Sequence, residues 1–349
     1  MRLLDLRHAN QVVWARRFDR QASDLLGLQD EIAAEVAAQT DSEILLIEAR
    51  RVANCLAAGA TAYHLVLRAL ALINRPERAA LAQAGEYLHQ AVARDPDYAA
   101  AHAWYAWWQA FMVGQRWAED PAVAIAAAEQ LADRAVLLDP FDARALTICG
   151  HVRAVLHRRL EEATLLHERA LALNPNLAMA WALSAVTHAY LGNVAEAERR
   201  NLRYKKLLPF DPFAFSFDAF FVLIDLMKGD YESAAMIGRS VVGMTPAFSA
   251  AYKPYLAALG YLGRVQEAAA ARRRLLAIEP GFSIRRFLEA TPLKRKMDCV
   301  HFAEGLRRAG VPEGDTTFLP PVSSFAFPAL SLHPENQRTL PVPAPASRP

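Results

Sequence analysis

Cysteine, long apolar runs and an excess of one charge are all scarce in this 349-residue sequence. Its three cysteines, Cys55, Cys149 and Cys299, stand far apart and are odd in number, so they predict neither a disulfide framework nor a CxxC metal site. No uncharged apolar run is long enough to span a bilayer, and the first ten residues lack the pattern of a signal peptide. The sequence therefore predicts a cytoplasmic protein that does not insert into a membrane.

The nearly balanced charge of the chain bears on its choice of partner. Lys and Arg number 39 against 37 Asp and Glu, a formal net charge of +2, and hydrophobic residues make up 54% of the chain. This composition supplies a core and excludes a disordered protein. Basic clusters such as Arg272 to Arg274 are short, whereas nucleic-acid binding needs a continuous basic stripe in a basic domain. We interpret the clusters as solvated outer faces, so no nucleic-acid partner is expected.

The motifs of familiar catalytic sites are missing as well. The sequence has no GxGxxG after a strand pattern, no GxxxxGKS/T, no GxSxG and no HExxH. Glu86 and His89 have the spacing of half a di-iron site, but a carboxylate-bridged metal pair needs that motif twice and it occurs once. The sequence predicts a protein that is not an enzyme and that binds neither a metal nor another cofactor.

What the sequence does contain is an internal repeat, marked by proline after an acidic or polar residue. These prolines are Pro96, Pro140, Pro175, Pro212, Pro246 and Pro280. Their spacings are 44, 35, 37, 34 and 34 residues. Ala234 and Ala268 stand where two crossing helices need a small residue, and Gly229 and Gly263 stand where a tight turn needs positive φ. Each proline ends the second helix of a unit, because it has no N–H to donate.

This pattern resembles the tetratricopeptide repeat, a unit of about 34 residues made of a helix, a tight turn and a second helix. The resemblance covers roughly residues 60–281, about six units. It implies an all-α fold, a right-handed helical solenoid of about six helix pairs. We expect this solenoid over residues 59–281, capping helices over residues 282–311 and a Pro-rich tail over residues 312–349. Nine of the twenty prolines lie in that tail, so it is expected to be disordered, either free or docked in the solenoid groove through its phenylalanines.

The N-terminal segment, residues 1–58, differs from the rest of the chain. Leu3 to Trp14 alternates loosely and predicts one or two strands, and a helix is expected from about Ser23 to Ala57 with Ser23 or Asp24 as its cap. Residues 13–20, 28–32 and 305–313 resemble bacterial regulators in which a TolB-amino-terminal-like α/β domain precedes tetratricopeptide repeats. The segment would then be a short remnant of that α/β domain plus a linker helix. The positions of the cyclase or winged-helix domains common in that group do not occur here, so no catalytic residue is implied.

The concave face of the predicted solenoid is the candidate site. In tetratricopeptide arrays the first helix of each unit faces inward, and this resemblance assigns to the groove Trp107, Phe111, Arg144, His151, Tyr190, Lys253 and Tyr261. The set is mostly apolar and aromatic, so the groove suits an apolar or amphipathic segment of a partner protein. The turn from Gly114 to Pro121 makes its unit the longest, and it is either a functional projection or a tolerated insertion.

Two classes of function remain open. The first is a non-catalytic scaffold for protein–protein interaction in bacterial signalling or transcriptional regulation. The second is the regulatory C-terminal portion of a class III adenylyl cyclase or winged-helix regulator whose N-terminal half is absent from this chain. The sequence encoded upstream of Met1 would discriminate between them. The oligomeric state does not follow from the sequence.

Overall fold

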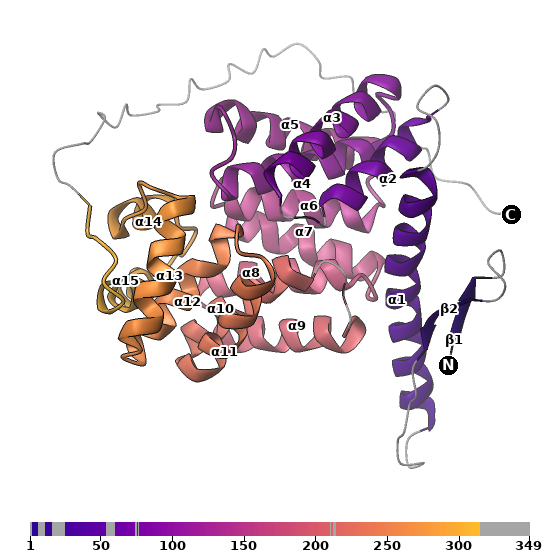
Figure 1. Ribbon diagram of the computed structural model, residues 1–349. Helices are drawn as coiled ribbons and strands as arrows, with labels where there is room; N and C mark the ends of the chain where they lie inside the picture. Colours follow the sequence, from indigo (N-terminus) through magenta and orange to yellow (C-terminus); the bar gives the residue numbers. More distant parts are fainter. Residues whose placement is uncertain are drawn as a thin grey trace, which may run out of the picture. The chain divides into compact units, whose positions relative to one another are not determined.

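A computed structural model describes residues 2–5, 11–15, 25–53, 60–73, 75, 77–209, 211 and 214–314 (Figure 1). The predicted caps Ser23 and Asp24, Cys55 and the tail from residue 315 lie outside the described residues. The elements in chain order are β1 (Arg2–Asp5), β2 (Gln11–Ala15), α1 (Leu25–Ala53), α2 (Ala62–Ile73), α3 (Arg78–Arg94), α4 (Ala99–Gly114), α5 (Pro121–Leu138), α6 (Ala143–Val155), α7 (Leu160–Leu173), α8 (Ala178–Leu191), α9 (Val194–Leu207), α10 (Ala214–Lys228), α11 (Tyr231–Met244), α12 (Ser249–Tyr261), α13 (Val265–Ile278), α14 (Ile284–Ala290) and α15 (Lys296–Arg308).

Helices α2 to α13 form six consecutive antiparallel pairs, which confirms the predicted all-α helical repeat. The first helix of each pair packs on the first helix of the next, and the second helices pack outside them. Ala197, Ala234 and Ala268 stand at the crossings within the last three pairs, where only 0%, 0% and 2% of their surface is exposed. Small side chains are needed there because the helix axes approach closely.

The turns within the pairs follow two patterns. In the last three pairs the turn contains Gly192, Gly229 or Gly263 at φ 84°, 88° and 66°, a backbone conformation that a Cβ atom disfavours. In the second pair the turn is longer, and Asp120 begins α5 by accepting hydrogen bonds from the N–H groups of Ala122 and Val123 at 2.9 and 3.2 Å. The enlarged turn predicted from the sequence is therefore real.

The C-terminal end of the array is covered by α14 and α15. Helix α15 packs on α12, and the rings of Phe287 and Phe302 join α14 to α15 with centroids 4.3 Å apart. Residues 312–314 belong to this cap and not to the tail predicted from Pro312. The carbonyl of Pro312 accepts a hydrogen bond from the N–H of Ile284 at 3.0 Å, and Glu313 accepts one from Arg285 at 3.1 Å.

The N-terminal segment contains the predicted strands and helix. Strands β1 and β2 pair antiparallel, with Leu3 opposite Trp14. Helix α1 packs at its C-terminal end on α2, where the main chain of Val52 accepts a hydrogen bond from Arg68 at 3.2 Å. Farther toward its N-terminus, Ala34 and Ala38 belong to the same apolar cluster as the inner helices α4 and α10. The chain's own helix α1 therefore lies along part of the concave face.

Candidate binding cavity

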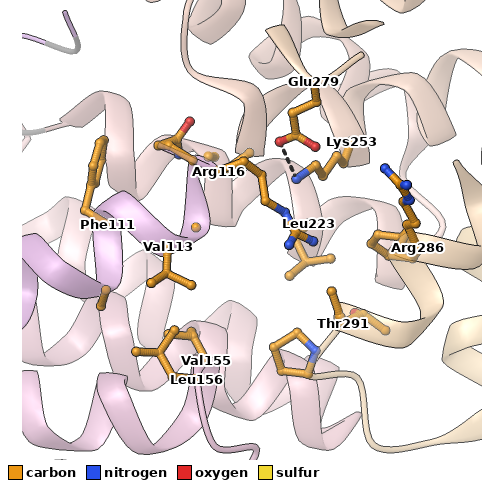
Figure 2. A pocket seen from close by; sticks show the side chains of 18 of the residues that line it. Phe111, Val113, Arg116, Val155, Leu156, Leu223, Lys253, Glu279, Arg286 and Thr291 are labelled. Atoms are coloured by element: carbon orange, nitrogen blue, oxygen red, sulfur yellow. Dashed lines mark hydrogen bonds and ion pairs between the residues drawn. The ribbon is translucent and has the colours of Figure 1, made fainter. Parts of the chain in front are cut away.

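The inner helices of the array line a half-open cavity of about 890 Å³ (Figure 2). Residues of α4, α6, α8, α10 and α12 line one side of it. The α4–α5 turn, the segment between α13 and α14, and α14 itself also line it. Its size falls within the range of pockets that bind small molecules or short peptide segments. The described part of the chain thus has a half-open cavity between the inner helices and the C-terminal cap.

Contacts between distant parts of the chain hold the walls of the cavity together. The side-chain oxygen of Gln115, in the α4–α5 turn, accepts hydrogen bonds from the N–H and the hydroxyl of Ser249 at 3.0 and 3.2 Å. Beside them the rings of Phe111 and Phe248 stack with centroids 5.9 Å apart. The enlarged turn, which the sequence left without an assigned role, therefore bridges from α4 to the start of α12.

A second set of contacts ties the middle repeats to the C-terminal cap. Arg158, in the turn after α6, donates a hydrogen bond to the main-chain carbonyl of Glu289 in α14. The N–H of Lys294 donates to the carbonyl of Tyr190 at 2.9 Å, and its ammonium group pairs with Glu161. The cap therefore serves as a wall of the cavity as well as a cover for the end of the array.

The structure brings five of the seven predicted groove residues together. Side chains lining this cavity include Trp107, Phe111, His151, Tyr190 and Lys253. They come from four different inner helices, which is the placement expected when each first helix faces inward. Phe111 and Tyr190 are partly exposed, and Phe220 and Phe287 add two further partly exposed rings to the wall. The apolar and aromatic character expected of the site is present here.

The other two predicted residues lie elsewhere. Arg144 lines a separate small cavity of about 60 Å³ beside α1, with its guanidinium 5.7 Å from the ring centre of Trp104. Tyr261 stacks on Tyr231 with ring centroids 4.4 Å apart, and its hydroxyl donates to the carbonyl of His301 at 2.7 Å. Helix α15 covers this position, so Tyr261 belongs to the cap interface and does not line the cavity.

Trp107 and His151 line the cavity but belong mainly to the core. They are 7% and 8% exposed, and their rings lie 5.0 Å apart. Burial lowers the pKa of His151 to about 4, so the imidazole is neutral at pH 7. Its Nδ1 is buried with no hydrogen-bond partner among the residues that the structure describes. These two residues therefore act as the floor of the site and are poor positions for a test by truncation.

Three arginines that line the cavity, Arg116, Arg158 and Arg286, were missed by the sequence analysis. Arg116 and Arg286 extend toward the same space as Lys253, which pairs with Glu279 at 3.0 Å (Figure 2). Burial lowers the pKa of Lys253, and the Arg116 charge lowers it further, whereas Glu279 raises it. Arg158 also lines the cavity. The three arginines were missed because they stand in turns and in the cap, outside the inward positions of the repeat.

The side chains that line the cavity supply groups suited to binding a ligand. Aromatic side chains, among them Phe111 and Tyr190, line the cavity together with the arginines Arg116 and Arg286. Among the described residues, no group of three His, Cys, Asp or Glu side chains is placed to hold a metal ion. No described helix is both long and apolar enough to cross a membrane.

Comparison with known proteins gives the fold but not a family. No protein-family model matches the sequence, and no curated protein matches it. Among solved structures, the human IFIT1 dimer with m7Gppp-AAAA is 16% identical with a TM-score of 0.51, and 78% of this chain and 65% of that chain are covered. The APC/C hetero-tetramer Cut9-Hcn1 is 15% identical with a TM-score of 0.51, covering 82% of this chain and 55% of that one.

Both of these structure neighbours are tetratricopeptide-repeat proteins. The fold is a tetratricopeptide-repeat array. The chain spans about 65% and 55% of the lengths of these two neighbours, so the likeness concerns the helical repeat alone. In this array the cavity lies on the concave side, which is formed by the first helix of each repeat.

Proposed function

We propose that this tetratricopeptide-repeat protein is a non-catalytic interaction scaffold that binds a short apolar or amphipathic segment of another protein in the central cavity. The observation that carries the proposal is the wall itself, in which Phe111, Tyr190, Phe220 and Phe287 are partly exposed around a hollow of about 890 Å³. Partly exposed aromatic side chains around a concave site are typical anchors for a protein partner.

The volume of the cavity sets the size of the bound segment. A helix with side chains has a diameter of about 10 Å and rises about 5.4 Å per turn. A cylinder of that width and of the observed volume is about 11 Å long, which corresponds to about two helical turns. The cavity therefore accommodates a few residues of the partner, with their side chains against the aromatic wall, and not a long helix.

Helix α1 supports the proposal from within the chain. Ala34 and Ala38 pack in one cluster with Trp104 and Phe217 of the inner helices, so the concave face accepts a helix with small side chains. Helix α1 covers the end of this face near α2 and leaves the central cavity outside its own contacts. A role in bacterial signalling or transcriptional regulation, as a separate protein or as the regulatory part of a longer one, rests on the resemblance of the chain's two ends to such regulators.

The test is to fill the cavity without disturbing the core. Ala290 lies at the exposed end of α14 and lines the cavity, so Ala290→Trp adds a large side chain there. The matched control is Ala79→Trp, at an exposed position of α3. Dodecapeptides selected by phage display against the full chain provide the probe, and fluorescence polarisation measures their Kd.

We expect selection to yield peptides with apolar or aromatic residues. Ala290→Trp should weaken their binding by tenfold or more, while Ala79→Trp should leave it unchanged. Circular dichroism checks that both variants fold. Peptides that bind Ala290→Trp as tightly as the wild type would contradict the assignment of the cavity, and so would a selection that yields no binder.

A further inference from the structure

Two arginines occupy a backbone conformation that the later repeats reserve for glycine. Among the described non-glycine residues, only Arg116 and Arg158 have positive φ, at 60° and 56°. They follow the first helices of the second and third pairs. The turns after the first helices of the last three pairs place Gly192, Gly229 and Gly263 in this conformation. A side chain with a Cβ atom is disfavoured here, so an arginine at this turn stands against the local backbone preference.

Both arginines line the same central cavity, and a third arginine, Arg286, lines it as well. The guanidinium of Arg116 has no hydrogen-bond or ion-pair partner within the described part of the chain, and it extends across the cavity toward Leu223 (Figure 2). Arg286 enters from α14 and is oriented by a hydrogen bond from its Nη1 to the carbonyl of Gly281 at 3.0 Å. Arg158 donates a hydrogen bond from one guanidinium nitrogen to the main-chain carbonyl of Glu289. N–H donors therefore remain on all three groups.

The charges around the cavity set the charge of what it can hold. The charged side chains that line it are Arg116, Arg158, Lys253, Glu279, Arg286 and Glu289. Lys253 and Glu279 form an ion pair with each other, and His151 is neutral. Four cations against two anions leave a surplus of two positive charges. This surplus matches one or two negative charges, and the two glutamates disfavour a ligand that carries more.

We propose that the cavity binds a carboxylate carried on an apolar or aromatic body, with Arg116 and Arg286 binding the carboxylate and Arg158 supporting it. Guanidinium groups form paired hydrogen bonds with carboxylates, while Phe111, Tyr190 and Leu223 contact the apolar part. The proposal rests on the proposed function in one respect: the source of the carboxylate is a partner segment, at its C-terminus or an acidic residue beside an aromatic one. The inward positions alone indicated an apolar segment, and the three arginines change that expectation.

The experiment compares a peptide carboxylate with its uncharged carboxamide and with two other anions. Isothermal titration calorimetry on the full chain uses acetyl-Leu-Phe with a free C-terminal carboxylate, the same peptide as its carboxamide, 3-phenylpropionate and inorganic phosphate. The peptide carboxylate should bind at least tenfold tighter than its carboxamide, because loss of a charge-assisted hydrogen bond costs about that much or more. It should also bind tighter than 3-phenylpropionate, since only the peptide has the second apolar side chain.

Two substitutions at one residue separate binding from folding. Arg116→Gln keeps the unfavourable backbone conformation and removes the charge. Arg116→Gly removes the charge and restores the residue used at Gly192 and its counterparts. Both variants should lose tenfold or more in affinity for the peptide carboxylate, and the glycine variant should melt no lower than the glutamine variant. Arg273→Gln, on the exposed side of α13, is the control and should bind as the wild type does.

The outcomes are distinct. Equal affinity for the carboxylate and carboxamide peptides, or unchanged binding by both Arg116 variants, would overturn the carboxylate site while leaving the scaffold proposal intact. Binding of 3-phenylpropionate as tight as that of the peptide would keep the carboxylate site but argue against a protein partner. Phosphate binding tighter than any carboxylate would overturn the ligand class.

Discussion

Helices α12 and α15 cross so closely that adding a single methyl group between them should force them apart. A Cβ atom added to Gly260 would lie 2.0 Å from the carbonyl oxygen of Gly305 and 2.8 Å from the main-chain nitrogen of Ala309. Non-bonded carbon contacts normally measure about 3.5 Å or more, so the two helices must move apart by about 1.5 Å to accept it. Both contacted atoms belong to the backbone, and no side-chain rotation can relieve the clash.

The magnitude follows from two opposing effects. Overpacking of this kind typically costs about 1–3 kcal/mol, and a backbone clash belongs at the upper end. Alanine in place of glycine within a helix returns roughly 0.5–1 kcal/mol. Gly260→Ala should therefore lower the free energy of unfolding by about 2 kcal/mol. Gly243→Ala in α11, where an added Cβ meets no atom within 4 Å, should raise it by about 0.5–1 kcal/mol.

Hydrogen exchange and urea unfolding together test this prediction. In Gly260→Ala the amides of α15, residues 296–308, should exchange faster, because the helix loses its packing on α12. Urea unfolding should place the midpoint of Gly260→Ala below that of the wild type and the midpoint of Gly243→Ala at or above it. If both variants unfold at the same urea concentration as the wild type, the helices do not cross at Gly260 and the reasoning fails.

Three further predictions concern the array and its ends. Leu in place of Ala197, Ala234 or Ala268 should cost on the order of 1–3 kcal/mol by overpacking, and unchanged thermal midpoints in all three variants would refute the repeat register. His151 keeps a pKa of about 4 in the folded protein against about 6.5 when unfolded, so the unfolded state binds the extra proton below pH 6.5. Between pH 7.5 and pH 5 this group should lower the free energy of unfolding by about 2 kcal/mol. Urea unfolding of the wild type and of a His151→Phe variant measures this, and the free energy of unfolding should depend less steeply on pH in the variant. Amides of β1 and β2 should exchange within seconds to minutes, because two paired strands alone are marginally stable, and strong protection there would contradict this.

The repeat was predictable because local rules recur in it. Gly229 provides the positive φ of a turn, and Ala234 provides the small side chain needed at a helix crossing. Both needs arise within one unit, so the spacing of these residues is visible in the sequence. Proline after each second helix marks the unit length for the same reason. The predicted one or two strands and the linker helix were also set by local patterns, and the structure places them at Arg2–Asp5, Gln11–Ala15 and Leu25–Ala53.

The site was predictable only in part, because it depends on how the repeats wind around each other. Inward positions such as Phe111 and Tyr190 follow from the repeat register alone. The burial of Trp107 depends on Phe217, more than a hundred residues away. Tyr261 lies outside the cavity because α15 folds back onto α12, and no signal within its own repeat indicates that contact.

Departures from the repeat prove more informative about the site than its matches. A residue with positive φ follows the first helix in five successive repeats, and in three of them it is glycine, which the backbone favours there. Arg116 and Arg158 are the exceptions, and both line the same cavity. The backbone disfavours arginine at this kind of turn, yet arginine occurs there twice. The best explanation is a function of the arginine side chain in the cavity. The turns that break the rule are adjacent in the array, and for this reason we propose the central cavity as the binding site.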